Sequence, residues 1–374
     1  MNFPRLIPRS IIFTWTPTVS RTNPTASTPC CFMSTGTKPA PWPIRPASSV
    51  IIAAPAHDTE PGDANYRILM IQRASKGPFG GLTVYPGGAI EASDADPEWT
   101  SVFQKAGVDA SDLERRSREA EQRFYVGALR ETFEEVGILL ATPKKRWTED
   151  EISEWRVKVH NDASQFIHMF KDGVGKGYAP DVGRLVHWAN WITPAIESKR
   201  FDTHFFLAVL PYPAGFAHTK YTAADGKETV SVQWVTPKEV LTQFKEGKIR
   251  MFPPQYYTLR DLQVNYPTLA HLSAFAQGSK SRTPFERVPM CPEAKQTPDG
   301  NLMLVLPGDE LHTSEGRVAV GKDTVEVVKR GGRNRVLTKR DKGGMSDIRV
   351  ERNMPGEWMS WGEGLDDGRR SGVL

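Results

Sequence analysis

Residues 130–138 read Arg-Glu-Thr-Phe-Glu-Glu-Val-Gly-Ile, and this stretch decides the fold. Its three glutamates are Glu131, Glu134 and Glu135. Their spacing of i, i+3 and i+4 places all three carboxylates on one face of a helix. Apolar residues at positions 129, 133 and 136 recur at helical spacing, and Gly137 follows where a C-cap glycine is expected. The pattern predicts a helix that is anchored in a core and presents three carboxylates.

Three carboxylates on a packed helix suit a hard divalent cation. Mg²⁺ prefers oxygen ligands, keeps several of its waters and commonly bridges to substrate phosphates. Taken alone, the triplet favours a solvated acidic face in which Arg130 pairs with Glu134. The upstream run Pro86-Gly87-Gly88 changes this interpretation. A Gly-Gly turn lets the backbone approach a metal or a phosphate without interference from a Cβ atom.

Length and charge restrict the classes of protein to consider. The 374 residues are enough to bury a sizeable core, and three cysteines cannot form a disulfide framework. No apolar run approaches 18 residues, so no membrane partner is expected. Residues 1–57 carry five basic and no acidic groups. Residues 58–274 carry 26 basic and 29 acidic groups, and residues 275–374 carry 17 basic and 15 acidic groups. Because the net charge of +4 arises from the two ends, nucleic acid is not an expected partner.

The two segments together resemble the Nudix box, G-x5-E-x7-R-E-U-x-E-E-x-G-U, in which U is apolar. Gly88 corresponds to the first glycine, and the second half of the box is matched by Arg130, Glu131, Glu134, Glu135, Gly137 and Ile138. Asp94 replaces the first-half glutamate, and Thr132 stands where an aliphatic residue is usual. Moreover, 35 residues separate Asp94 from Arg130, where the pattern has seven.

One branch of the Nudix hydrolase superfamily has such an interruption, that of the peroxisomal coenzyme A diphosphatase, nucleoside diphosphate-linked moiety X motif 19. The chain resembles this branch over about residues 50–270, through matching stretches at 69–73, 84–88, 92–96, 130–135, 188–194, 200–203 and 253–256. The resemblance implies the Nudix fold, an α+β class with a mixed β-sheet sandwiched between helices. It also implies a small-molecule nucleotide substrate and a possible homodimer.

Three regions are expected along the chain. Residues 1–48 are rich in Pro, Ser and Thr without acids, which predicts a disordered leader. Its arginines resemble a mitochondrial presequence, with a peroxisomal or cytosolic location as alternatives and Met33 as an alternative start. The Nudix domain is expected over residues 49–277, with the box insertion at about 95–128. Residues 278–374 are expected to form a partly β C-terminal extension.

The insertion is expected to lengthen the glutamate-bearing helix. Ser111-Asp112-Leu113-Glu114 has capping-box spacing, so we expect a single helix from Ser111 to the box. A second helix is expected over residues 148–171, and short ones over 237–246 and 254–262. Strands are expected at residues 50–54, 67–73, 82–85, 185–191, 203–210 and 230–235, and in the extension at 302–306, 318–320, 325–328 and 348–350.

The resemblance also implies roles in the site. Mg²⁺, or Mn²⁺ in its place, would be bound by the Gly87 carbonyl and by Glu131, Glu134 and Glu135, and Arg130 would orient the glutamates. Water would then attack phosphorus, and Glu134 or Glu135 could take its proton. Glu228 precedes a strand, near where many Nudix enzymes carry a loop glutamate. Our hypothesis is that Glu228 is a ligand or the base, with an ordinary turn acid as the equal alternative.

Four further residues are candidates for substrate binding. Arg73 could contact phosphate or form a surface salt bridge, and Gly88 lies in the glycine turn. Tyr85 and Tyr256 could stack an adenine, although aromatic residues in this setting are more often core. The expected reaction is hydrolysis of coenzyme A or acyl-CoA to phosphopantetheine and adenosine 3′,5′-bisphosphate. The alternatives are another adduct (ADP-ribose, NADH or an RNA cap) and a Nudix-fold binding module without turnover.

Overall fold

The computed structural model describes residues 43–75, 80–144, 147–212, 229–277, 288–313, 317–320, 323–326, 332–341 and 344–352. Most of the predicted leader, including Met33, lies outside these ranges, and so does Glu228. Within them, no helix is both long and apolar enough to cross a membrane.

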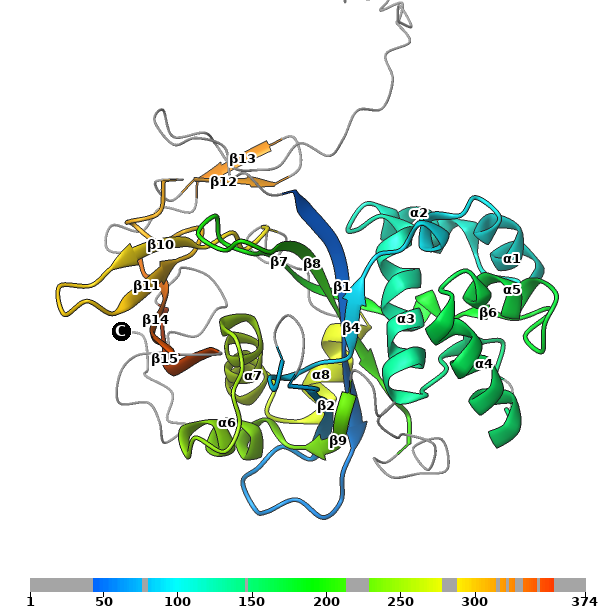
Figure 1. Cartoon of the computed structure of the whole chain (residues 1–374), viewed down its shortest axis with the longest axis horizontal. Helices are drawn as coiled ribbons and strands as arrows, with labels where there is room; N and C mark the ends of the chain where they lie inside the picture. The colour runs from blue at the N-terminus through cyan, green and yellow to red at the C-terminus, as the bar shows by residue number, and fades with distance from the viewer. Residues whose placement is uncertain are drawn as a thin grey trace, which may run out of the picture. The chain divides into compact units, whose positions relative to one another are not determined.

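A seven-stranded mixed sheet is the frame of the domain (Figure 1). Its strands are β1 (Ile44–Pro55), β2 (Tyr66–Arg73), β3 (Thr83–Val84), β4 (Gly87–Ala89), β7 (Val186–Ile192), β8 (Arg200–Val209) and β9 (Thr229–Val235). The order is β3-β2-β1-β8-β7, with β4 paired to β1 and β9 paired to β2. β1 is parallel to β8 and antiparallel to β2 and β4. The central strand β1 therefore carries the continuous apolar run expected of a strand that is covered on both faces.

The strand β1 starts earlier than predicted. It begins at Ile44, inside the segment predicted as leader, because Ile44 pairs with Arg200 and Ala47 pairs with both Thr203 and Ala89. The Pro- and Ser-containing composition of this stretch concealed the strand, since strand propensity depends on the neighbours available for pairing.

Helices cover both faces of this sheet, as predicted. Alternate residues of β1 enter two different cores, Val50 and Ile52 on one side and Ile51 and Ala53 on the other. The first core contains α3 (Gln122–Val136), and the second contains residues of α6 (Pro237–Lys245), α7 (Pro253–Asn265) and α8 (Leu269–Ala276). The sheet thus separates the glutamate-bearing helix from the helices that follow β9.

The insertion lengthens α3 only through residues 122–128, so the prediction of a single helix from Ser111 is wrong. After the 3-10 helix η1 (Ala92–Ala95), the insertion forms the separate helices α1 (Trp99–Lys105) and α2 (Ala110–Ser117), and α3 begins at Gln122. The cap of α2 is Asp109, whose side chain accepts from the Ser111 N–H, rather than Ser111 itself. The Arg116 guanidinium donates to the carbonyls of Gly183 and Leu185, which holds α2 against the start of β7.

The helix predicted over residues 148–171 is two helices. They are α4 (Glu149–Asn161) and α5 (Gln165–Lys171). Asp162 interrupts them in an extended conformation, and its carboxylate accepts from the N–H and hydroxyl of Ser164. The turn therefore follows from side-chain capping, which periodicity does not reveal. The short elements β5 (Ala141–Thr142), β6 (Ala179–Pro180) and η2 (Val182–Arg184) connect this region to β7.

The C-terminal part is β-rich, as predicted. A four-stranded antiparallel sheet is formed by β10 (Glu293–Gln296), β11 (Leu302–Val305), β14 (Asn334–Asp341) and β15 (Gly344–Arg352). The hairpin β12 (Arg317–Val320) and β13 (Asp323–Glu326) pairs separately. Leu304, Val336 and Met345 belong to the second core, and the Tyr257 hydroxyl of α7 donates to Asn334 Oδ1 at 3.0 Å. The extension therefore shares a core with α7.

Candidate active site

The helix α3 carries the three predicted glutamates at its C-terminal end. Most of its other residues are buried, and it ends at Gly137, whose φ of 74° is left-handed. The side chains of Glu131, Glu134 and Glu135 are 15%, 12% and 4% exposed. A Cβ atom at Gly88 would lie 2.6 Å from the Glu131 carboxyl carbon. Only glycine at position 88 therefore leaves space for that carboxylate.

Arg130 is the centre of a buried ion-pair network. It is 2% exposed. Its Nε donates to Asp94 Oδ1 at 2.8 Å, and its Nη2 donates to Asp94 Oδ2 and the Ala89 carbonyl, each at 2.9 Å. Its Nη1 donates to Glu131 Oε1 at 3.0 Å and Glu134 Oε1 at 2.6 Å. All five guanidinium N–H groups are thus occupied. Arg130, which was expected to orient the glutamates, contacts two of them and has no donor left for substrate.

Glu135 is held by a different set of contacts. Its Oε2 accepts from the Gly87 N–H at 2.8 Å, and Arg73 Nη1 lies 3.5 Å from its Oε1. Gly87 has a φ of 153°, and a Cβ atom there would lie 2.3 Å from the Ser48 carbonyl oxygen. The structure therefore places Gly87 and Arg73 beside the Glu135 carboxylate. The contact of Gly87 shown by the structure is made by its N–H.

The glutamates are crowded electrostatically. Burial raises the pKa of Glu131 to about 7; the Arg130 charge lowers this pKa, while the Glu134 charge raises it. Burial also raises the pKa of Glu134, against the lowering effect of Arg130. One guanidinium therefore does not fully compensate the group. Additional positive charge at this face would favour the ionised carboxylates.

Two predicted substrate-binding residues lie elsewhere. Tyr85 is 2% exposed in the second core, where its ring meets Phe205 edge-on at 6.4 Å, and burial raises the pKa of its hydroxyl. The Tyr256 ring lies 5.4 Å from the Phe244 ring, centroid to centroid, and is partly buried against the second core. The prediction that these rings stack an adenine is wrong for Tyr85, which is a core residue. Tyr256 lies on the side of the sheet opposite α3.

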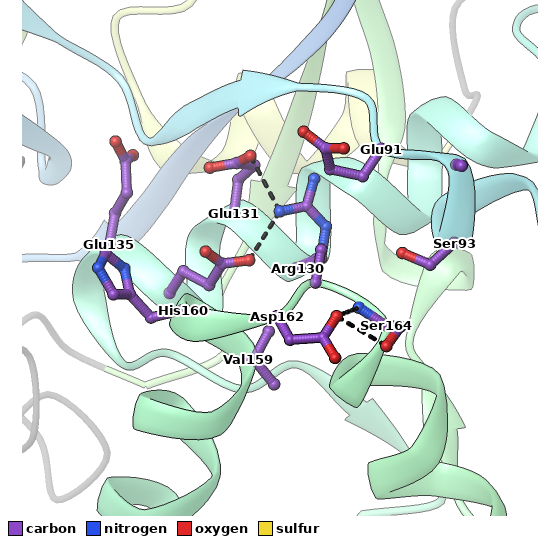
Figure 2. A pocket seen from close by; sticks show the side chains of 12 residues that line it. Glu91, Ser93, Arg130, Glu131, Glu135, Val159, His160, Asp162 and Ser164 are labelled. Carbon is purple, nitrogen blue, oxygen red and sulfur yellow. Dashed lines mark hydrogen bonds and ion pairs between the residues drawn. The ribbon is translucent and has the colours of Figure 1, made fainter.

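A pocket of about 520 Å³ opens beside the glutamates (Figure 2). One wall contains Arg130, the three glutamates and residues of η1 with the preceding Glu91. The opposite wall comes from the end of α4 and the start of α5 and includes His160, Asp162 and Ser164. This second wall was not predicted from the sequence. The only available signal was helical spacing in α4, which places Arg156 and His160 on one face.

Comparison with known proteins identifies the family. Residues 44–262 match the model of the NUDT19 Nudix domain, which is more than half of the chain. The chain belongs to the NUDT19 Nudix family. It is therefore a Nudix hydrolase, and the reading as a binding module without turnover is not favoured, because all three carboxylates of the box are in place.

Alignments with individual relatives cover more of the chain than the Nudix domain does. Acyl-coenzyme A diphosphatase NUDT19 of Xenopus laevis is 32% identical over 317 residues, which are 72% of this chain and 80% of that protein. The human protein of the same name is 28% identical over 350 residues, 80% of this chain and 90% of that protein. Among solved structures, a Nudix hydrolase of Alicyclobacillus acidocaldarius aligns with 60% of this chain and 92% of its own, at 24% identity and a TM-score of 0.44.

Nudix hydrolases generally use divalent metal ions, and the donors on α3 fit one. Three carboxylates form an all-oxygen set of the kind that hard cations prefer. The raised pKa values of Glu131 and Glu134 show that these two carboxylates lack compensating charge. Among the described residues, however, no three His, Cys, Asp or Glu side chains converge as ligands of one ion. The glutamate oxygens are turned instead toward Arg130 and the Gly87 N–H.

The Arg130–Asp94 pair is expected to determine stability. Asp94→Asn removes one charge from a pair in which both side chains are at most 2% exposed, and should lower the unfolding free energy by about 3–5 kcal/mol. Chemical denaturation measures this change. Asp58→Asn is the control, because Asp58 forms an exposed pair with Arg67, and it should leave stability nearly unchanged. Equal stability of the two variants would contradict the structural role of Asp94.

The raised pKa of Glu131 predicts a pH effect in protein stripped of metal with EDTA. Because the folded pKa of about 7 exceeds the reference value of 4.5, this group stabilises the fold below about pH 4.5 and loses that contribution as pH rises through 7. Glu131→Gln should therefore gain stability relative to wild type between pH 5 and 8, on the order of 1–3 kcal/mol. Denaturation at four pH values tests this, with the exposed Glu154→Gln as control. A pH-independent difference would refute it.

Proposed function

We propose that the protein hydrolyses the diphosphate bond of coenzyme A or acyl-CoA, giving phosphopantetheine and adenosine 3′,5′-bisphosphate. The observation that carries the reaction class is the intact triad of Glu131, Glu134 and Glu135, fixed by Arg130 and Gly87 beside a pocket. The substrate class is supported by relatives that are named acyl-coenzyme A diphosphatases and align with most of this chain.

Mg²⁺ is the proposed cofactor, with Mn²⁺ as a substitute. Glu131, Glu134, Glu135 and the Gly87 backbone are the groups that would hold it. A bound divalent ion offsets charge on phosphate oxygens and lowers the pKa of a bound water. The residues of the chain supply position: Arg130 holds two carboxylates at fixed distances, and the Gly87 N–H holds the third. The two walls of the pocket would orient the diphosphate between them.

Glu228 is proposed as the general base. The residue itself lies outside the described residues. Support comes from its neighbour Thr229, which begins β9 and pairs with Arg73 at the end of β2. Arg73 Nη1 in turn lies 3.5 Å from Glu135 Oε1. A base that is not itself a metal ligand keeps its lone pairs available for the proton of the attacking water.

Product analysis tests the substrate. The full chain would be incubated with Mg²⁺ and CoA, acyl-CoA, ADP-ribose, NADH or capped RNA, and products separated by chromatography. We expect phosphopantetheine and adenosine 3′,5′-bisphosphate from the first two. Glu134→Gln and Glu135→Gln should lower turnover by more than about tenfold, whereas Glu114→Gln, on the exposed side of α2, should not. Faster hydrolysis of another member of the panel would overturn the proposed substrate.

Kinetics of a single variant test the base. Glu228→Gln should lower kcat by about 10²–10⁴-fold, because the proton of the attacking water loses its acceptor. The thermal midpoint should stay at the wild-type value. Asp225→Asn, which changes the other acid of the same segment, is the control and should keep full turnover. Near-wild-type kcat for Glu228→Gln would remove this residue from the mechanism.

A further inference from the structure

The pocket contains few groups that can bind an anionic diphosphate. Its charged lining is mainly acidic, with Glu91 and Asp162 in addition to the three glutamates of α3. Among the described residues that line the pocket, Arg130 is the one arginine or lysine, but its five N–H donors are all used within the protein. Apart from the Ser93 hydroxyl beside the glutamates, phosphoryl oxygens that enter this pocket therefore need a donor from the opposite wall.

His160 is such a donor. It lines the pocket from the last turn of α4, facing the wall that carries the glutamates (Figure 2). Neither ring nitrogen has a hydrogen-bond partner among the residues that the structure describes. The Ser164 hydroxyl on the same wall donates to Asp162 and is thereby occupied. A neutral imidazole also carries one N–H, so His160 can donate without being protonated.

Arg156 ties α4, the helix that carries His160, to the end of α3. Its Nε donates to the Glu134 carbonyl at 2.8 Å and its Nη2 to the Glu135 carbonyl at 2.7 Å. These carbonyls belong to the last turn of α3, where helical carbonyls lack partners within the helix. Since Arg156 and His160 are four residues apart on α4, they share a face. The Arg156 hydrogen bonds that hold α4 against the end of α3 thus also place His160 on the side of α4 that faces the glutamates.

We propose that His160 is a substrate-binding residue that donates a hydrogen bond from its ring N–H to a phosphoryl oxygen of the diphosphate. This inference rests on the proposed function for the identity of the substrate, but its geometry requires only a diphosphate in the pocket. A role as a ligand of the metal is disfavoured, because hard divalent cations prefer oxygen to imidazole nitrogen. The volume of about 520 Å³ lies within the range of small-molecule sites.

Steady-state kinetics of the full chain with CoA and Mg²⁺ test the proposal. His160→Leu should lower kcat/KM by about 10–100-fold, the effect expected for a hydrogen bond to a charged group. His160→Asn or His160→Gln, whose amide keeps an N–H near one or the other ring nitrogen, should recover most of this loss. His168→Leu is the matched control, because His168 is an exposed histidine on α5 that does not line the pocket.

Calorimetry gives a second readout that does not depend on turnover. Titration with the non-hydrolysable diphosphate imidodiphosphate in Mg²⁺ should show at least about tenfold weaker binding to His160→Leu. Titration with Mg²⁺ alone should show unchanged affinity. Weaker binding of Mg²⁺ itself would make His160 a metal ligand and overturn the proposal. Unchanged imidodiphosphate affinity in His160→Leu would also overturn the proposal. The same holds if all three His160 variants lose activity together with a lower thermal midpoint.

The same measurements separate this inference from the proposed function. If wild-type protein does not hydrolyse CoA, the proposed substrate fails, while the imidodiphosphate titration still decides the role of His160. If wild-type protein hydrolyses CoA and His160→Leu matches it in kcat/KM and in imidodiphosphate affinity, only the role of His160 fails.

Discussion

The buried guanidinium of Arg130 is the constraint on which the site depends. A buried charge is tolerated only when it is paired and its donors are bonded. Asp94 of η1, the Ala89 carbonyl of β4 and two glutamates of α3 meet that requirement together. The neighbouring elements β4 and η1 must therefore lie against one side chain of α3, which is 36 to 41 residues further along the chain. The positions of Glu131 and Glu134 follow from satisfying Arg130.

Much of the frame was predictable because its signals are local. The apolar spacing around Phe133 indicated a packed α3, and alternation indicated the strands of the sheet. Asp94, which the motif comparison placed at the position of the box glutamate, pairs with Arg130. The course of the insertion was not predictable in this way. Residues 118–121 contain no Pro or Gly to signal a break, and α2 is instead directed by bonds from Arg116 to carbonyls near β7.

The site itself was predictable only where the box defines it. The motif located Gly87 and the glutamates but could not show which side of the sheet the aromatic residues face. Tyr85 consequently proved to be a core residue, and Tyr256 packs with α6. His160 has no motif, and it reaches the pocket because Arg156 bonds to carbonyls about twenty residues earlier in the chain. Such a contact is a property of tertiary structure.

The separate folding of the insertion has an entropic consequence. The ion pair between Asp94 and Arg130 joins the two halves of the box. The chain between these two residues is therefore a loop with fixed ends. Closure entropy grows only with the logarithm of loop length, and extending the spacer from seven to 35 residues costs about 1.4 kcal/mol. Contacts such as Trp99 against Phe166 and Phe170 are available to offset that cost. The bonded ends of the box can thus tolerate large changes in length between them.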